Sequence, residues 1–75
     1  MANTTNPSTN DFVGRYLKEA RTKANVTQGQ MAIALNMSKN HISALERGKC
    51  KVSVDVLMGY CRRLQTTPAV ILHYK

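Results

Sequence analysis

Five short segments, each opened by a residue type that caps helices, constrain the fold of this chain more than any other feature of its sequence. The caps are Asn10, Thr27, Ser38, Ser53 and Thr67. Apolar residues at helical spacing follow each cap, and no segment alternates as a strand would. Because helices this short are stable only when they pack together, the 75 residues predict one all-α domain of five helices. The domain is expected over residues 10–75, after a flexible tail at residues 1–9.

The spacing of apolar residues predicts which face of each helix is buried. In the first helix this face comprises Val13, Tyr16, Leu17, Ala20 and Ala24. In the fourth it comprises Val54, Leu57, Met58, Cys61 and Leu64. The fifth helix is expected from Ala69 to about Tyr74, after a proline at a position that favours helix starts.

The second and third segments are separated by a joint of only three residues. Thr27 and Gln30 have the spacing of a capping box at the start of the second helix. Asn36 tolerates the left-handed conformation that ends a helix, Ser38 caps the third helix, and Gly48 ends it. Two short helices joined so tightly are typical of a helix-turn-helix motif.

The charge balance points to a polyanionic partner. Eleven Lys and Arg stand against four Asp and Glu, which gives a formal net charge of +7. Nucleic acid is the commonest partner of so basic a small domain, although a basic soluble protein or an anionic membrane would also account for the charge. The first ten residues are polar and no apolar run approaches the roughly 20 residues of a membrane span. We therefore expect a cytoplasmic, nucleoid-associated protein with no membrane partner.

No residues have the spacing of a metal site or of a catalytic centre. His41, His73, Cys50 and Cys61 show neither C-x2-C nor H-x3-H spacing. The chain has no Gly-rich phosphate loop and no plausible nucleophile and base. We expect no enzyme activity, no cofactor and no metal, with both cysteines reduced and Cys61 a small core residue.

An ordered set of residues resembles the lambda-repressor/Cro family of helix-turn-helix domains, also called the XRE type. The set comprises Leu17, Arg21, Thr27-Gln28, Met31-Ala32, Leu35, Ser38, Ile42-Ser43, Glu46-Arg47-Gly48, Ser53, Leu57 and Leu64. The resemblance covers roughly residues 11–73 and implies a lambda-repressor-like fold. Asn36 stands where the family most often has Gly in the turn, and Val52 replaces the usual Pro before the fourth helix.

The resemblance also implies residues that contact DNA. Those expected to read base edges are Ser38, Lys39, Asn40, Ser43 and Ala44. Those expected to contact phosphate are Gln28, Arg47, Lys49 and Lys51. Asn and Lys side chains can pair with adenine and guanine in the major groove, whereas phosphate contacts position the protein without specifying sequence. Arg21 and Glu46 are expected to form the internal ion pair of this family, a structural role.

These expectations describe a sequence-specific transcriptional regulator of double-stranded DNA, most simply a repressor, with the helix of residues 38–47 in the major groove. The resemblance implies a homodimer on DNA, and the apolar last helix is the candidate for part of the dimer surface. The alternative is an antitoxin-type or protein-interaction module of the same fold, which would bind a protein partner as well as DNA.

Overall fold

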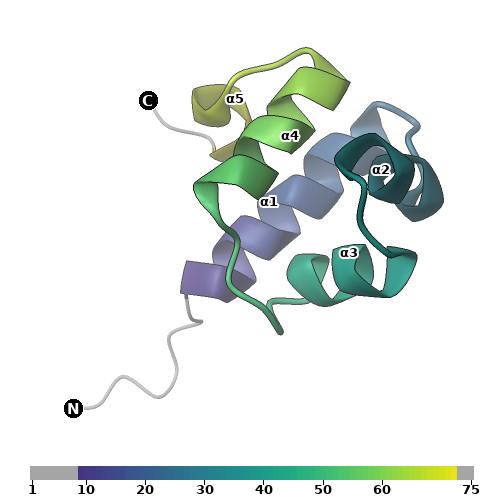
Figure 1. The fold of residues 1–75 in the computed structure, drawn as a ribbon. Coiled ribbons are helices and arrows are strands. Elements are labelled where there is room, and N and C mark those ends of the chain that lie inside the picture. The colour runs from purple at the N-terminus through teal and green to yellow at the C-terminus, as the bar shows by residue number, and fades with distance from the viewer. Residues whose placement is uncertain (1–8, 73–75) are drawn as a thin grey trace.

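The computed structural model describes residues 9–72, with the side chains of residues 13–72. Within that range the chain forms five helices joined by short connections, with no strand (Figure 1). They are α1 (Thr9–Lys23), α2 (Gln28–Leu35), α3 (Lys39–Glu46), α4 (Val54–Leu64) and α5 (Pro68–Leu72). The all-α prediction is confirmed. Helix α1 begins one residue before the predicted cap, and the remaining residues of the predicted tail, 1–8, lie outside the described residues, as do His73 and Tyr74.

The predicted caps open four of the five helices. The Thr27 hydroxyl accepts the amide of Gln30 at 3.0 Å, and the Gln30 side chain accepts the amide of Thr27 at 2.8 Å, so the capping box is complete. The hydroxyls of Ser38 and Ser53 accept amides three residues on, at 3.0 and 3.2 Å. Thr67 does the same for α5 at 3.3 Å. Local hydrogen bonds therefore set where these helices begin.

Left-handed residues follow the first four helices. Asn25, Asn36 and Gln65 have φ values of 59°, 56° and 56°, and Gly48 follows α3 with φ 76°. The left-handed prediction for Asn36 is confirmed. The next amide, that of Met37, donates to a carbonyl of α2 at 2.8 Å, which satisfies a group that the helix end leaves without a partner.

Helix α1 runs through the middle of the molecule and contacts α3, α4 and α5 (Figure 1). Helix α2 packs against α3 and α4. The largest fully buried side chains come from all five helices, and they are Tyr60, Leu17, Met31, Ile42, Leu45 and Ile71. A single core therefore fixes the position of α3 relative to the rest of the domain.

The predicted buried faces need correction at three positions. Ala24 is exposed and lies beyond the end of α1. Val54 and Met58, predicted to be core, are 73% and 38% exposed, whereas Tyr60 is fully buried. Helix α4 is thus turned so that Tyr60 points inward, where its hydroxyl finds a hydrogen-bond partner. Cys61 is buried as predicted, and both cysteines are free thiols.

Two glycines allow helices to approach closely. A Cβ atom on Gly14, in α1, would collide with the backbone carbonyl oxygen of Leu45 in α3. A Cβ atom on Gly59, in α4, would lie 2.9 Å from the Leu35 side chain of α2. These contacts bring α1 against the end of α3 and α4 against the end of α2.

Candidate nucleic-acid interface

Helix α3 presents a polar outer face because its apolar residues follow one inner stripe. Ile42 and Leu45 are 0% and 1% exposed, and Glu46 is also buried. The short turn after α2 leads directly into the Ser38 cap, so the first turn of α3 lies at the surface. The inner stripe holds the helix while its outer residues remain free to contact a ligand.

The five residues predicted to read bases divide into two groups. Ser38, Lys39 and Asn40 are exposed, whereas Ser43 and Ala44 are half-buried. The Ser38 hydroxyl already accepts the amide of His41, so it retains its proton as a donor. The exposed surface at the start of α3 therefore carries an ammonium, an amide and a hydroxyl within three successive residues.

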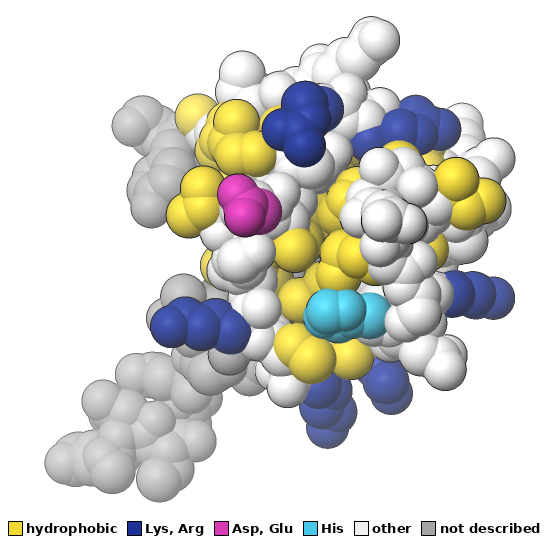
Figure 2. Space-filling view, in the orientation of Figure 1, with side chains coloured by type: hydrophobic (Ala, Val, Ile, Leu, Met, Phe, Trp, Pro, Cys, Tyr) yellow, Lys and Arg dark blue, Asp and Glu magenta, His cyan; other side chains and the backbone are white. Residues whose placement is uncertain are grey.

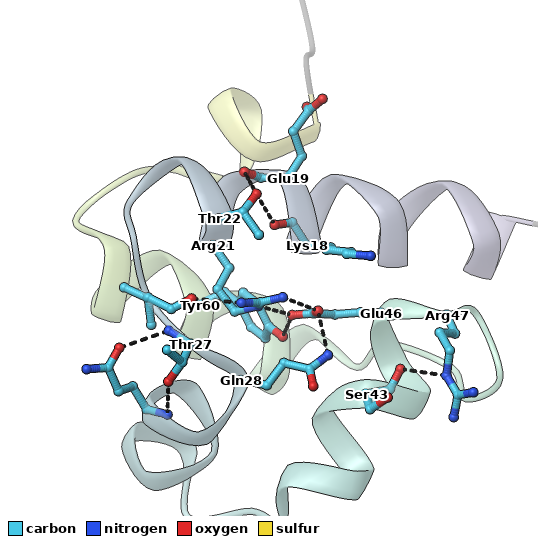
Figure 3. A network of polar contacts seen from close by, with 12 residues as sticks. Lys18, Glu19, Arg21, Thr22, Thr27, Gln28, Ser43, Glu46, Arg47 and Tyr60 are labelled. Carbon is cyan, nitrogen blue, oxygen red and sulfur yellow. Dashed lines mark hydrogen bonds and ion pairs between the residues drawn. The ribbon is translucent and has the colours of Figure 1, made fainter.

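The cations predicted to contact phosphate lie at the other end of α3 and in the loop that follows. Arg47, Lys49 and Lys51 are all exposed. The Arg47 Nε donates to the Ser43 carbonyl at 3.4 Å, which leaves the rest of its guanidinium outward (Figure 3). This loop supplies three positive charges beside the polar face of α3.

Gln28 is less free than the sequence indicates. It is half-buried, and its Nε2 donates to Glu46 Oε1 at 3.3 Å (Figure 3). The cap of α2 belongs to Thr27 and Gln30 instead. Gln28 therefore links the start of α2 to the end of α3, and the second hydrogen on its Nε2 is the donor available to a phosphate.

A hollow of about 560 Å³ opens at the start of α2. Its lining includes Thr27, Gln28 and Gly29 together with Lys39 from α3. Free backbone amides at a helix start attract anions, and an ammonium beside them adds to that attraction. The fold thus brings Lys39, predicted to read bases, next to the predicted phosphate contact Gln28.

A buried network fixes the end of α3 to three other helices (Figure 3). Arg21 of α1 binds Glu46 through Nε at 2.7 Å and through a second nitrogen at 2.9 Å, and its third nitrogen donates to the Val26 carbonyl at 2.7 Å. The predicted ion pair is confirmed. Tyr60 of α4 donates its hydroxyl to Glu46 Oε2 at 2.7 Å. With Gln28 of α2, four hydrogen bonds converge on one carboxylate.

The network keeps its charges ionised although it is buried. Burial raises the pKa of Glu46, but the hydrogen bonds from Arg21, Tyr60 and Gln28 together outweigh it, so the pKa lies below its usual value. The hydrogen bond to Glu46 raises the pKa of Arg21. Burial, and then the bond to the carboxylate, raise the pKa of Tyr60. At neutral pH the pair is charged and the phenol is protonated.

Tyr60 is the residue of this network that the sequence analysis did not name. Tyr60 lies on an apolar stripe with Val56, whereas the predicted stripe passes through Val54 and Met58. Leu57 and Leu64 belong to both stripes. Both stripes have helical spacing, so periodicity does not choose between them. The expected burial of Glu46 is the signal that could have identified Tyr60, because a buried carboxylate requires hydrogen-bond donors and Tyr60 supplies one.

The described part of the chain holds no group of three His, Cys, Asp or Glu that could bind a metal ion. His41 is exposed on α3, and His73 is outside the described range. Among the helices described, none combines the length and the apolar character that crossing a membrane requires.

Comparison with known proteins gives both a family and solved structures. The family described as a helix-turn-helix domain matches residues 13–73. The crystal structure of the clp gene regulator ClgR from C. glutamicum is 31% identical, with a TM-score of 0.86 over 91% of this chain and 88% of that chain. The restriction-modification controller protein C.AhdI from Aeromonas hydrophila shares the fold at 23% identity, with a TM-score of 0.74 over 81% of this chain and 92% of that chain. Among curated proteins, no sequence matches.

Proposed function

This chain belongs to the helix-turn-helix family and is a DNA-binding transcriptional regulator, and from that premise we propose that residues 38–47 enter the major groove and read a specific duplex sequence. The observation that carries the proposal is the placement of α3. Its apolar stripe is buried in the core, and its first turn offers Lys39 and Asn40 to solvent. A protruding polar helix of this kind fits the width of the major groove.

Lys39 and Asn40 are the main base-reading residues of the proposal. An Asn amide can bind adenine through two hydrogen bonds, and a Lys ammonium can reach the acceptors of guanine. Ser38 can donate its hydroxyl proton while it caps α3. Ser43 and Ala44, which are half-buried, contribute shorter contacts, such as that of the Ala44 methyl with thymine.

Phosphate contacts flank the reading face on both sides. On one side, the start of α2 offers free amides, Gln28 and the neighbouring Lys39 around one hollow. On the other side lie Arg47, Lys49 and Lys51, all exposed. Each phosphate neutralised by these cations releases counterions, so binding should weaken steeply with salt.

The proposal extends to a homodimer that acts as a repressor in the cytoplasm, associated with the nucleoid. Val70 on α5 is 66% exposed, whereas Ile71 of the same helix is 2% exposed and belongs to the core. Among the residues of α5, Val70 is thus the one with a large exposed apolar side chain. Two copies joined near α5 would place two reading helices on successive major grooves.

The proposal is tested by selection from a random duplex library at about 150 mM salt, where non-specific binding is weak. Enrichment of a palindrome with half-sites about ten base pairs apart is expected. Replacing Lys39 and Asn40 with Ala should abolish recovery of the motif. Lys18→Ala is the matched control, because this exposed lysine of α1 lies on another helix. Equal enrichment by the reading-face variant and the control would contradict the proposal.

A further inference from the structure

A second groove lies between α2 and α4, and none of the residues proposed to contact DNA lines it. Its volume is about 620 Å³. The floor includes Leu35 and Val56, both half-buried, and Gly59, which brings the two helices together. Figure 2 looks onto this side of the molecule, where apolar side chains appear between α4 and α2 and cationic side chains appear near the end of α4. The groove offers apolar surface within a charged rim.

The two ends of the groove carry opposite charges. Arg62 and Arg63, both exposed, line it where α4 ends, and Asp55 lines it where α4 begins. Neither arginine side chain forms a hydrogen bond or ion pair with the described part of the chain. One cation would suffice to complement the dipole at a helix end. Two guanidinium groups beside an apolar floor form a more specific arrangement, because guanidinium binds carboxylate through paired hydrogen bonds.

We propose that the groove between α2 and α4 binds an acidic, partly apolar segment of a protein partner, whose carboxylates meet Arg62 and Arg63 while its apolar side chains cover Leu35 and Val56. Asp55 would repel an acid at the opposite end, so the segment binds in one direction. The two charged ends are about 10 Å apart along α4, the rise of seven helical residues. The proposal does not rest on DNA recognition.

A second copy of this chain is a poor occupant of the groove. The sequence has four acidic residues in all. Glu46 is buried in the Arg21 network, and Asp55, which lines the groove, would offer a second copy one carboxylate for two guanidinium groups. Asp11 and Glu19 are eight positions apart, about 12 Å along α1, so they cannot supply two neighbouring carboxylates. The charge complementarity therefore favours a different, acidic protein.

The test is selection of short random peptides on the immobilised full-length chain. Three proteins are compared, namely the wild type, Arg62→Gln with Arg63→Gln, and Lys18→Gln with Lys23→Gln. Both double variants remove two exposed positive charges, and each includes a cation from the last turn of a helix. Melting temperatures of the three proteins show whether each is folded.

The wild type should enrich peptides that combine Asp or Glu with Leu or Ile. The Kd of a selected peptide should weaken about tenfold or more in the arginine variant, as expected for the loss of charge-assisted hydrogen bonds, and about twofold or less in the lysine variant. A saturating duplex should leave the peptide bound, and the arginine variant should retain its affinity for DNA.

Four results would each overturn the proposal. They are no enrichment of acidic peptides, an equal loss of affinity in both double variants, displacement of the peptide by duplex DNA, and self-association that the arginine variant abolishes. An equal loss of affinity in both double variants would show that only net charge matters. Displacement of the peptide by duplex would show that DNA binds the groove. Self-association that depends on the arginines would show that a second copy binds it. DNA selection by the same proteins is read separately, so failure of the groove is distinguishable from failure of the reading helix.

Discussion

The hydroxyl of Tyr60, in α4, lies 2.7 Å from Glu46 Oε2 at the end of α3, and it donates a hydrogen bond to that buried carboxylate. Arg21 approaches the same oxygen, also at 2.7 Å. The helix proposed to read DNA is therefore fixed to its scaffold by a polar contact among apolar ones. Such a contact tolerates few other geometries, because a buried charge that loses its partners is strongly destabilising.

Tyr60→Phe should lower the free energy of unfolding by about 1.5–3 kcal/mol, the range for a hydrogen bond to a charged group. The aromatic ring remains, so the core keeps its volume and the loss isolates the hydroxyl. Urea denaturation measures it, with an unchanged m-value as evidence that the compactness of the two states is the same. A change below about 0.5 kcal/mol would mean that the hydroxyl is dispensable.

Glu46→Ala should be more severe, because it leaves the Arg21 guanidinium buried without its counter-ion. Breaking a buried pair by removing one partner costs about 3–5 kcal/mol. The matched variant is Glu19→Ala, which removes an exposed carboxylate from α1 and should cost no more than about 1 kcal/mol, the upper value for a contact of an exposed charge. Thermal denaturation compares the two, and equal shifts in melting temperature would argue against a stabilising pair.

Acid should destabilise the domain through Glu46. Its folded-state pKa lies below the usual value, so the folded state binds a proton less readily than the unfolded state near pH 4. The stabilisation is therefore fully present above the unfolded pKa of about 4.3 and is lost as the pH falls through the lowered folded pKa. Urea titrations between pH 7 and pH 3 should show a smaller loss for Glu46→Gln than for the wild type. An equal loss of stability in the two proteins would mean that a group other than Glu46 causes the acid sensitivity.

Gly14→Ala and Gly29→Ala should have opposite effects although both lie in helices. A methyl group on Gly14 would meet the backbone of Leu45 and Glu46, which cannot move aside as a flexible side chain would. Overpacking of this kind costs about 1–3 kcal/mol. A methyl group on Gly29 has its nearest neighbour 3.9 Å away, so alanine should add up to about 1 kcal/mol through helix propensity. Differential scanning calorimetry measures both, and destabilisation by both variants would contradict the assigned packing.

Gln65→Gly should stabilise the domain by about 0.5–1 kcal/mol, because Gln65 has φ 56° and a side chain that disfavours this conformation. Asn36→Gly should gain less, since Asn tolerates the left-handed region better than Gln. Chemical denaturation of the two single variants gives the comparison. A larger gain at Asn36 would show that the turn before α3 is the more strained of the two.

The helix boundaries could be predicted from the sequence because they depend on neighbouring residues. Thr27, Ser38 and Ser53 each bond an amide three positions away, and the left-handed end at Asn36 follows from its short polar side chain. The joint between α2 and α3, and with it the exposure of Lys39 and Asn40, follows from these local signals.

The rotation of α4 could not be predicted in this way, because its cause is distant in sequence. Tyr60 is turned inward by a carboxylate 14 positions earlier, and Gln28 is drawn to the same group 18 positions away. Apolar periodicity contains no information on such polar partners. The ion pair of Arg21 with Glu46 was expected from the family resemblance, whereas the two neutral donors that complete it emerged only from the structure.

The polar contacts of α3 lie at one end of the helix, and its proposed base-reading residues lie at the other. The polar anchor lies at Glu46, and Asn40 is six residues away, a span of about 9 Å along the helix axis. If the helix tilted by about 10° about Glu46, Asn40 would therefore move by roughly 1.5 Å, half the length of a hydrogen bond. A substitution at Tyr60 that leaves the domain folded should therefore weaken its discrimination between DNA sequences, although Tyr60 is buried and does not contact the duplex.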